Sequence, residues 1–301
     1  MDQAEQLRKL VQNQEKPQQT ARVITVTSGK GGVGKTNIAV NIAIQMRKRG
    51  LRVIILDADF GLANVEVMLG VRPQYNLADL MFRGKSLPDI ITRGPEDIGF
   101  ISGGSGIQEL ARLTKEQVMS LTQKLVELDS MADVIIIDTG AGIADNVLEF
   151  VCAGSEVLLV ATPEPTSITD AYALLKTLNK KSGFSKENTS IKMISNRVRN
   201  EAEGTSLYEK MSVVVDKFLN IQPQFLGIIP QDDSVSKAVM LQKPISLAFP
   251  ASAAAKAFEV ITDKLLEGNE GGEEGKKGIT VFFSNLIRSK LKKSRSKKEE
   301  K

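Results

Sequence analysis

The chain has 301 residues, a formal net charge of +4, no histidine and one cysteine, Cys152. One cysteine excludes an intrachain disulfide and a zinc site built on paired cysteines, and the lack of histidine excludes imidazole ligands and histidine acid–base catalysis. Cys152 is therefore expected to be a small buried hydrophobic residue on a helix. The length suits one large α/β domain or two smaller ones.

The first 20 residues divide into a helical pattern and a linker. Within 1–11, apolar side chains recur at helical spacing, and the polar stretch QNQEKPQQT that follows reads as a linker. The charged start of the chain lacks the apolar core of a signal peptide. No run in the sequence approaches the roughly 18 apolar residues that span a bilayer. We therefore expect a cytoplasmic protein.

From residue 21 onward, short β-branched runs alternate with longer amphipathic segments. Near-continuous apolar strands separated by helices indicate a parallel sheet covered by helices on both faces. The expected fold is a single doubly wound α/β domain over 21–267, with a mostly parallel sheet of seven to eight strands. The expected strands are 23–28, 52–56, 98–101, 133–137, 156–161, 190–195 and 225–229, and the expected helices are 35–49, 114–128, 143–153, 167–181, 206–219, 233–241 and 251–267.

The chain ends in a linker and a basic tail. Residues 268–277 are rich in Gly and Glu and are expected to be a flexible acidic linker. Residues 276–301 contain ten Lys/Arg and two Glu, a local charge of +8, so the other 275 residues of the chain sum to about −4 and are slightly acidic. The expected tail itself is 278–301. A basic tail of this kind suggests an anionic surface, either lipid or nucleic acid.

Residues 29–36 read GKGGVGKT and match the phosphate-loop pattern GxxxxGK[ST]. The match lies between an expected strand and an expected helix, where glycine backbone N–H groups and the helix N-terminus can surround phosphate oxygens. Lys35 is expected to hold the β- and γ-phosphates, and the Thr36 hydroxyl to ligate Mg²⁺. The alternative is a glycine-rich turn without a ligand. The expected ATP/ADP contacts in this segment are Gly29, Lys30, Gly31, Gly32, Val33, Gly34, Lys35, Thr36 and Asn37.

Carboxylates follow two of the expected strands. Asp57 and Asp59 come after 52–56, and Asp138 follows 133–137. Both positions are at the carboxyl edge of a parallel sheet, where open α/β folds bind ligands. Four hydrophobic residues followed by an aspartate form the Walker B pattern, so Asp138 is the candidate for Mg²⁺. The alternative for Asp57 and Asp59 is that they cap the following helical turn.

The segment KGGVGKT resembles the deviant Walker A motif of the MinD/ParA-type ATPases. The resemblance implies that the first lysine, Lys30, reaches the partner's phosphates in an ATP-bound dimer, whereas the alternative is a solvated lysine beside a flexible turn. It further implies that Asp59 positions the attacking water and that Asp57 supports the metal. The implied catalytic set is Lys30, Lys35, Asp59 and Asp138, the metal set is Thr36, Asp57 and Asp138, and the adenine set is Asn196, Arg197, Pro230, Gln231 and Asp232.

The segment 2–8, DQAEQLR, resembles the N-terminal motif of the FlhG (YlxH/FleN) family of flagellar number regulators. The resemblance implies that this helix stimulates the GTPase FlhF and that flagellar C-ring (switch) proteins are further partners. The implied contacts with FlhF are Asp2, Gln3, Ala4, Leu7 and Arg8. The alternative is a frayed terminal helix without a partner.

Residues 279–291, ITVFFSNLIRSKL, place their large apolar side chains within about half of a helical wheel. Bulky apolar residues beside a basic face suit an anionic membrane surface, and the MinD-type resemblance favours the same interpretation. One alternative is that this helix docks onto the core or a partner. Another is that it binds nucleic acid, for which there is no strong case. The residues expected to meet the membrane are Ile279, Phe282, Phe283, Leu286, Ile287 and Leu291.

These features together predict an ATPase switch. ATP with Mg²⁺ would form a homodimer bound to the inner face of the cell membrane, and hydrolysis would return monomers to the cytoplasm. The FlhG resemblance implies that the switch controls the number or placement of flagella. The alternatives are a division-site ATPase of MinD type and a DNA-partitioning ATPase of ParA type.

Overall fold

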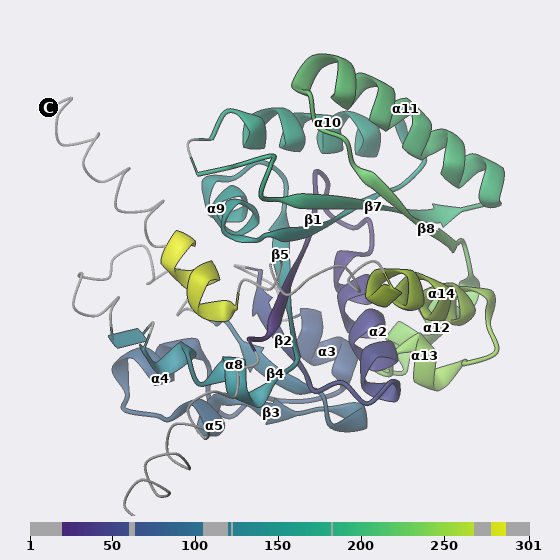
Figure 1. Cartoon of the computed structure of the whole chain (residues 1–301). Helices are drawn as coiled ribbons and strands as arrows, with labels where there is room; N and C mark the ends of the chain where they lie inside the picture. Colours follow the sequence, from purple (N-terminus) through teal and green to yellow (C-terminus); the bar gives the residue numbers. More distant parts are fainter. Residues whose placement is uncertain are drawn as a thin grey trace, which may run out of the picture.

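The computed structural model describes residues 20–59, 64–104, 120–121, 123–181, 183–267 and 278–286. Its strands form one eight-stranded sheet in the order β3-β4-β2-β5-β1-β6-β7-β8 (Figure 1). Every pairing is parallel except that of β3 with β4, so the predicted fold class is confirmed. The strands are β1 Arg22–Ser28, β2 Val53–Ala58, β3 Thr92–Arg93, β4 Gly99–Ser102, β5 Val134–Ala141, β6 Glu156–Ala161, β7 Ser190–Val198 and β8 Gln224–Pro230.

Helices cover both faces of the sheet because successive side chains of each strand point to opposite faces. On β1, Ile24 packs into one hydrophobic cluster with α2 and α14, and Val23 packs into another cluster on the opposite face. Figure 1 shows α2, α12, α13 and α14 together on one side, with α10 and α11 on the other. The helices are α2 Lys35–Lys48, α3 Asn64–Leu69, α4 Leu77–Phe82, α5 Leu87–Ile90, η1 Pro95–Asp97, α8 Leu128–Met131, α9 Asp145–Ala153, α10 Pro165–Asn179, α11 Glu201–Leu219, α12 Asp233–Met240, α13 Ile245–Ala248 and α14 Ala253–Glu267.

Several boundaries differ from the sequence prediction. Helix α11 begins at Glu201 because the Asn200 side chain caps it and accepts a hydrogen bond from the backbone N–H of Glu203. Strand β5 continues to Ala141, so Asp138 lies within the strand and not after it. The short helices α3, α4, α5 and α13 and the two-residue strand β3 were not predicted, since they are too short to show a period. Of the expected helix 114–128, residues 114–119 and 122 lie outside the described residues, and the described residues 120, 121 and 123–125 are helical.

The C-terminal helix (279–286) docks on the core of the α/β domain, where it is the yellow helix of Figure 1. The side chains of Ile279, Phe282, Phe283 and Leu286 are at most 2% exposed and belong to the cluster that also contains Phe150. The ring centroids of Phe282 and Phe150 are 6.0 Å apart. We expected this apolar face to be available to a membrane. In this structure it is instead buried against the core, which was the alternative. Ile287 and Leu291 lie outside the described residues, as do the N-terminal motif residues.

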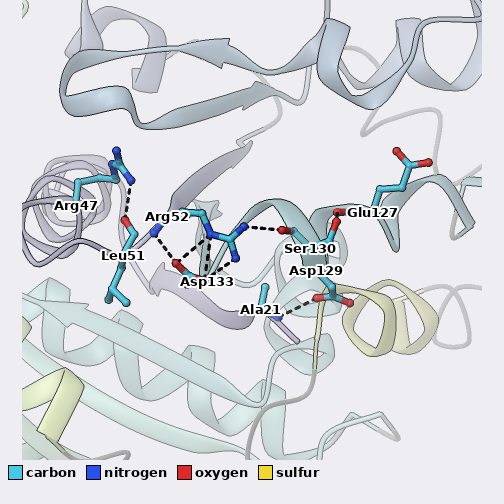
Figure 2. A network of polar contacts seen from close by, with 8 residues as sticks. All are labelled: Ala21, Arg47, Leu51, Arg52, Glu127, Asp129, Ser130 and Asp133. Carbon is cyan, nitrogen blue, oxygen red and sulfur yellow. Dashed lines mark hydrogen bonds and ion pairs between the residues drawn. The ribbon is translucent and has the colours of Figure 1, made fainter. Parts of the chain in front are cut away.

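A polar network lies at the amino edge of the sheet (Figure 2), and one of its members, Asp129, holds the first turn of the C-terminal helix. Asp129 Oδ1 accepts hydrogen bonds from the backbone N–H of Ala21 at 3.2 Å and of Ile279 at 3.0 Å. Its Oδ2 accepts a hydrogen bond from the Thr280 hydroxyl at 3.0 Å. One carboxylate thus joins the start of β1 to the start of the C-terminal helix. Next to it, Arg52 forms an ion pair with Asp133 at 2.7 Å.

Two further expectations concern single features. Cys152 is 8% exposed on α9, which confirms the prediction of a buried helical cysteine. Within the described ranges, no helix has both the length and the apolar character needed to cross a bilayer.

Candidate active site

The phosphate loop joins β1 to α2 and is fixed in place by contacts that only glycine permits. A side chain on Gly29 would overlap the backbone of Asp170 and Ala171 on α10. Gly34 has φ +96°, a left-handed conformation that favours glycine, and a side chain there would meet the Asn196 amide. The loop is therefore held between α10 on one side and the end of β7 on the other.

The loop brings a cation, a hydroxyl and a carboxylate together. Lys35 is 7% exposed, and burial lowers the pKa of its ammonium group. The negative charges of Asp138 and Asp59 raise this pKa, but by less than burial lowers it. The Thr36 hydroxyl donates a hydrogen bond of 2.6 Å to Asp138 Oδ2. The residues predicted from the phosphate-loop and Walker B patterns thus meet at the carboxyl edge of the sheet.

The residues present fit a magnesium ion. Asp138 Oδ1 is buried without a hydrogen-bond partner, so a buried acceptor is left over beside the Thr36 hydroxyl. The described residues contain no group of three or more His, Cys, Asp or Glu that could hold a metal ion by itself. Mg²⁺ typically takes one or two protein carboxylates and completes its octahedron with water and substrate phosphates, so one carboxylate and one hydroxyl suffice.

Asp57 lies opposite Asp138 on the neighbouring strand. It is 4% exposed, and burial raises the pKa of its carboxyl to about 8, with smaller contributions from the negative charges of Asp138, Asp59 and Glu66. Burial also raises the pKa of Asp138 to about 6, although the Thr36 hydrogen bond and Lys35 oppose the shift. Asp57 is thus protonated near neutral pH, whereas Asp138 is mostly ionised.

Asp59 lies beside Asp57 and Asp138. Its backbone N–H donates a hydrogen bond of 3.0 Å to Asp57 Oδ1, so the Asp57 side chain does shape the turn, as the capping alternative proposes. The Asp59 carboxylate lies near Gly140 at the end of β5. It is also close enough to Lys35 and Asp138 to affect the pKa of each. Asp59 is therefore placed at the same edge as the phosphate loop.

Lys30 makes an ion pair within its own chain. Its Nζ donates hydrogen bonds to Glu164 Oε2 at 2.6 Å and to the Thr166 hydroxyl at 2.9 Å. Both acceptors lie at the N-terminus of α10, and the Lys30 side chain remains 35% exposed. Glu164 was not among the residues predicted from sequence, although its place just after β6, at the same sheet edge as the aspartates, was the available signal.

A cavity of about 260 Å³ lies beside the loop, between the ends of β7 and β8. All five residues of the predicted adenine set line it, together with Gly34 and Asn37 from the phosphate loop and helix α2. The residues that line it and were not predicted are mostly apolar and suit the faces of a purine ring: Ile38, Ile229, Val235, Ser236 and Phe258.

Two of the predicted adenine residues serve the protein backbone as well. Asn196 Nδ2 donates a hydrogen bond of 2.7 Å to the carbonyl of Val33, which closes the phosphate loop against β7. Asp232 caps α12 and accepts hydrogen bonds from the backbone N–H groups of Ser234 and Ala254. Direct contact of either side chain with a base stays a prediction.

Comparison with known proteins agrees with this geometry. Residues 24–245 match the family model for the CobQ/CobB/MinD/ParA nucleotide binding domain. The antiactivator FleN of Pseudomonas aeruginosa is 44% identical over 244 residues, which cover 81% of this chain and 86% of FleN. The flagellum site-determining protein YlxH of Helicobacter pylori is 32% identical over 270 residues, which cover 89% of this chain and 90% of YlxH.

Solved structures have the same fold. The cell division ATPase MinD of Pyrococcus furiosus superposes with a TM-score of 0.64 at 25% identity, covering 82% of this chain and 99% of MinD. MinD of Pyrococcus horikoshii, solved with Mg-ADP, superposes with a TM-score of 0.64 at 24% identity, covering 85% of this chain and 99% of that protein. From the family match, the relatives and the geometry of the phosphate loop, the chain belongs to the CobQ/CobB/MinD/ParA family and is a P-loop ATPase of the MinD/ParA type.

Proposed function

We propose that this protein is an ATP-dependent dimerising switch that hydrolyses ATP to ADP and phosphate and controls the number or placement of flagella. The observation that carries the proposal is the 44% identity with FleN over 81% of the chain. The name of the Helicobacter pylori relative, a flagellum site-determining protein, supports the same process.

Within one chain, the described residues would provide the parts of a phosphoryl-transfer site. Lys35 would neutralise the β- and γ-phosphates, and the loop N–H groups would bind their oxygens. Thr36 and Asp138 would hold Mg²⁺, which when bound supplies positive charge to the phosphates. Asp59 would orient the attacking water. No strong base is required, because this reaction depends mainly on positioning and charge neutralisation.

The second lysine would complete the site of the other subunit. Lys30 is held at the start of α10 by Glu164 and Thr166, at the edge of the sheet where the nucleotide cavity lies. In a face-to-face dimer, Lys30 would exchange the Glu164 carboxylate for the partner's phosphates. Since both are anionic oxygen acceptors, the lysine would not lose its charge pairing during the exchange.

Membrane binding in the ATP state would require the C-terminal helix to leave the core. The same apolar side chains would be buried in the lipid or in the protein, so their hydrophobic contribution nearly cancels between the two states. The balance would then depend on the contacts with Asp129 and on the attraction of the basic tail to anionic lipid, about 1 kcal/mol for each basic residue near the surface. Two tails in a dimer would strengthen membrane binding further.

Partner proteins would bind at other surfaces. The N-terminal residues Asp2, Gln3, Ala4, Leu7 and Arg8 would stimulate the GTPase FlhF, and flagellar C-ring proteins would be further partners. Both proposals rest on the resemblance of residues 2–8, which lie outside the described part of the chain. Addition of a 1–20 peptide to FlhF should raise its GTPase rate, and a peptide with Gln3→Ala and Arg8→Ala should not.

The test of the cellular role is complementation of Pseudomonas aeruginosa lacking FleN. The wild-type chain should restore the normal number of flagella, as should Lys256→Ala, an exposed substitution on α14. Lys35→Ala should not restore it, because the phosphate charge is left without its buried cation. Rescue of division in a strain lacking MinD, without any change in flagella, would instead support a division-site ATPase.

A further inference from the structure

Two asparagines on α2 are joined beside the nucleotide cavity. Asn37 lines the cavity, and Asn41, one helical turn later, is 0% exposed. Asn41 Nδ2 donates hydrogen bonds of 2.8 Å to both the backbone carbonyl and the side-chain Oδ1 of Asn37. The cavity-facing amide is thus held by a buried amide behind it.

The orientation of the Asn41 amide is fixed by backbone groups on both sides. Its oxygen accepts a hydrogen bond of 3.0 Å from the backbone N–H of Ser246, which can only donate. Its nitrogen faces the carbonyl of Asn37, which can only accept. Exchanging the oxygen and nitrogen of Asn41 would break both bonds, so the usual ambiguity of an amide does not apply here.

This arrangement decides which way the Asn37 amide points. Because Asn37 Oδ1 is engaged by Asn41, its NH₂ group is directed away from Asn41. Asn37 Nδ2 makes no hydrogen bond to any residue that the structure describes. A free donor therefore remains on a residue that lines the nucleotide cavity.

Ser246, which donates to the Asn41 oxygen, is itself held in place by α2. Ser246 is the second residue of α13, and N–H groups in the first turn of a helix have no partner within the helix. Asn41 supplies that partner, while Lys48 Nζ donates a hydrogen bond of 3.0 Å to the Ser246 carbonyl. Both backbone groups of Ser246 are thus bonded to α2 side chains.

We propose that Asn41 is a positioning residue that fixes the Asn37 amide with its NH₂ toward the nucleotide, where Asn37 donates a hydrogen bond to an acceptor of ADP or ATP. Two kinds of atom on the ligand could accept this hydrogen bond: a phosphate oxygen or the adenine ring nitrogen N7. An inverted Asn37 amide would present a carbonyl oxygen to the same acceptors and repel them. This role goes beyond the P-loop pattern, which does not include a residue at position 41.

The test is a double-mutant cycle on ADP affinity, measured by calorimetry with Mg²⁺ on the full chain. Asn37→Ala and Asn41→Ala should each weaken binding about tenfold, the size expected for one hydrogen bond to this ligand. If Asn41 acts through Asn37, the double variant should bind ADP no more weakly than Asn37→Ala alone. Additive losses, or normal affinity in Asn37→Ala, would overturn the proposal.

Controls separate positioning from stability. Gln45 lies one turn further along α2 and is also buried, at 1% exposure, so Gln45→Ala should lower the melting temperature without weakening ADP binding. If Asn41→Ala does not fold, Asn41→Asp retains the size of the side chain but cannot donate to Asn37, and it should show the same non-additive loss. With 7-deaza-ADP, weaker binding to the wild type assigns the acceptor to N7, and unchanged binding assigns it to phosphate.

Discussion

Lys30 Nζ and Glu164 Oε2 are 2.6 Å apart, so the lysine that distinguishes this phosphate loop is paired within its own chain. The hydrogen bond from Lys30 lowers the pKa of Glu164, and the lysine charge lowers it further. The carboxylate therefore stays ionised throughout the neutral range. In the proposed dimer, this contact has to be exchanged for one with the partner's nucleotide.

Glu164→Gln should favour the ATP-bound dimer, because the amide holds Lys30 less strongly than the carboxylate does. Each pair is exposed to solvent and should contribute at most about fivefold, and a symmetric dimer exchanges two of them, so the dissociation constant of the dimer should fall by at most about 25-fold. The measurement is sedimentation equilibrium with ATP in an Asp59→Ala background, which would slow hydrolysis. Glu187→Gln, an exposed change that does not involve Lys30, should have no effect. A weaker dimer in Glu164→Gln would mean that Glu164 itself contacts the partner.

Gly29→Ala should lower the melting temperature by several degrees and weaken nucleotide binding. Its methyl group would overlap the backbone of Asp170, and backbone cannot move aside as a flexible side chain can. Gly31→Ala is the matched control, since nothing lies within 4 Å of a methyl group at that position. Thermal denaturation without nucleotide distinguishes the two variants. Equal stability would mean that the loop does not pack against α10 in this way.

The sheet and the site at its carboxyl edge could be predicted because their determinants are local. A buried parallel strand is a continuous apolar run, and Asp57 and Asp138 each come at the end of such a run. The phosphate loop has a fixed pattern of glycines, Lys35 and Thr36. Parallel strands then bring these local signals to one edge without any further information.

Other features depend on contacts between distant residues. Glu164 could not be paired with Lys30 from sequence, since the pair joins residues 134 positions apart. Asn41 is a polar residue on a buried helix face, and one of its partners, the backbone N–H of Ser246 on α13, is 205 positions away in the sequence. The apolar stripe on the C-terminal helix suits lipid and protein equally well, so its docked position depends on distant core residues such as Phe150, against which it packs.

Asp57→Asn should stabilise the protein at and above neutral pH in the absence of nucleotide and Mg²⁺. The carboxyl has an ordinary pKa of 3.8, but burial raises it to about 8 in the folded protein. Between these values the folded state binds a proton that the unfolded state has lost. The free energy of unfolding should therefore fall by up to about 1.4 kcal/mol for each pH unit from pH 4 to pH 8 and then level off.

The measurement is thermal denaturation of both proteins in EDTA at several values between pH 5 and pH 9. Asp57→Asn removes the ionisable group, so its melting temperature should fall less steeply with pH and should exceed that of the wild type most clearly at pH 8 and above. Asp216→Asn, on the exposed face of α11, should retain the wild-type slope. An unchanged slope in Asp57→Asn would show that another group titrates in this range.

Asp129→Ala should release the C-terminal helix and raise binding to anionic liposomes in the ADP state. The substitution removes the acceptor for the Ile279 N–H and the Thr280 hydroxyl, a loss of about 0.5–2 kcal/mol for a helix cap. Because the apolar side chains are buried in either state, a change of this size should shift docking by about two- to thirtyfold. The measurement is co-sedimentation with vesicles that contain anionic lipid.

Asp133→Ala is the matched control for this prediction. Its carboxylate lies in the same polar network and pairs with Arg52 (Figure 2). It should therefore leave liposome binding in the ADP state at the wild-type level. Phe282→Asp, combined with Asp129→Ala, should abolish the gain, since a charged residue on the apolar face disfavours insertion. If Asp129→Ala pellets no more than the wild type in ADP, the Asp129 contacts do not hold the helix back from the membrane.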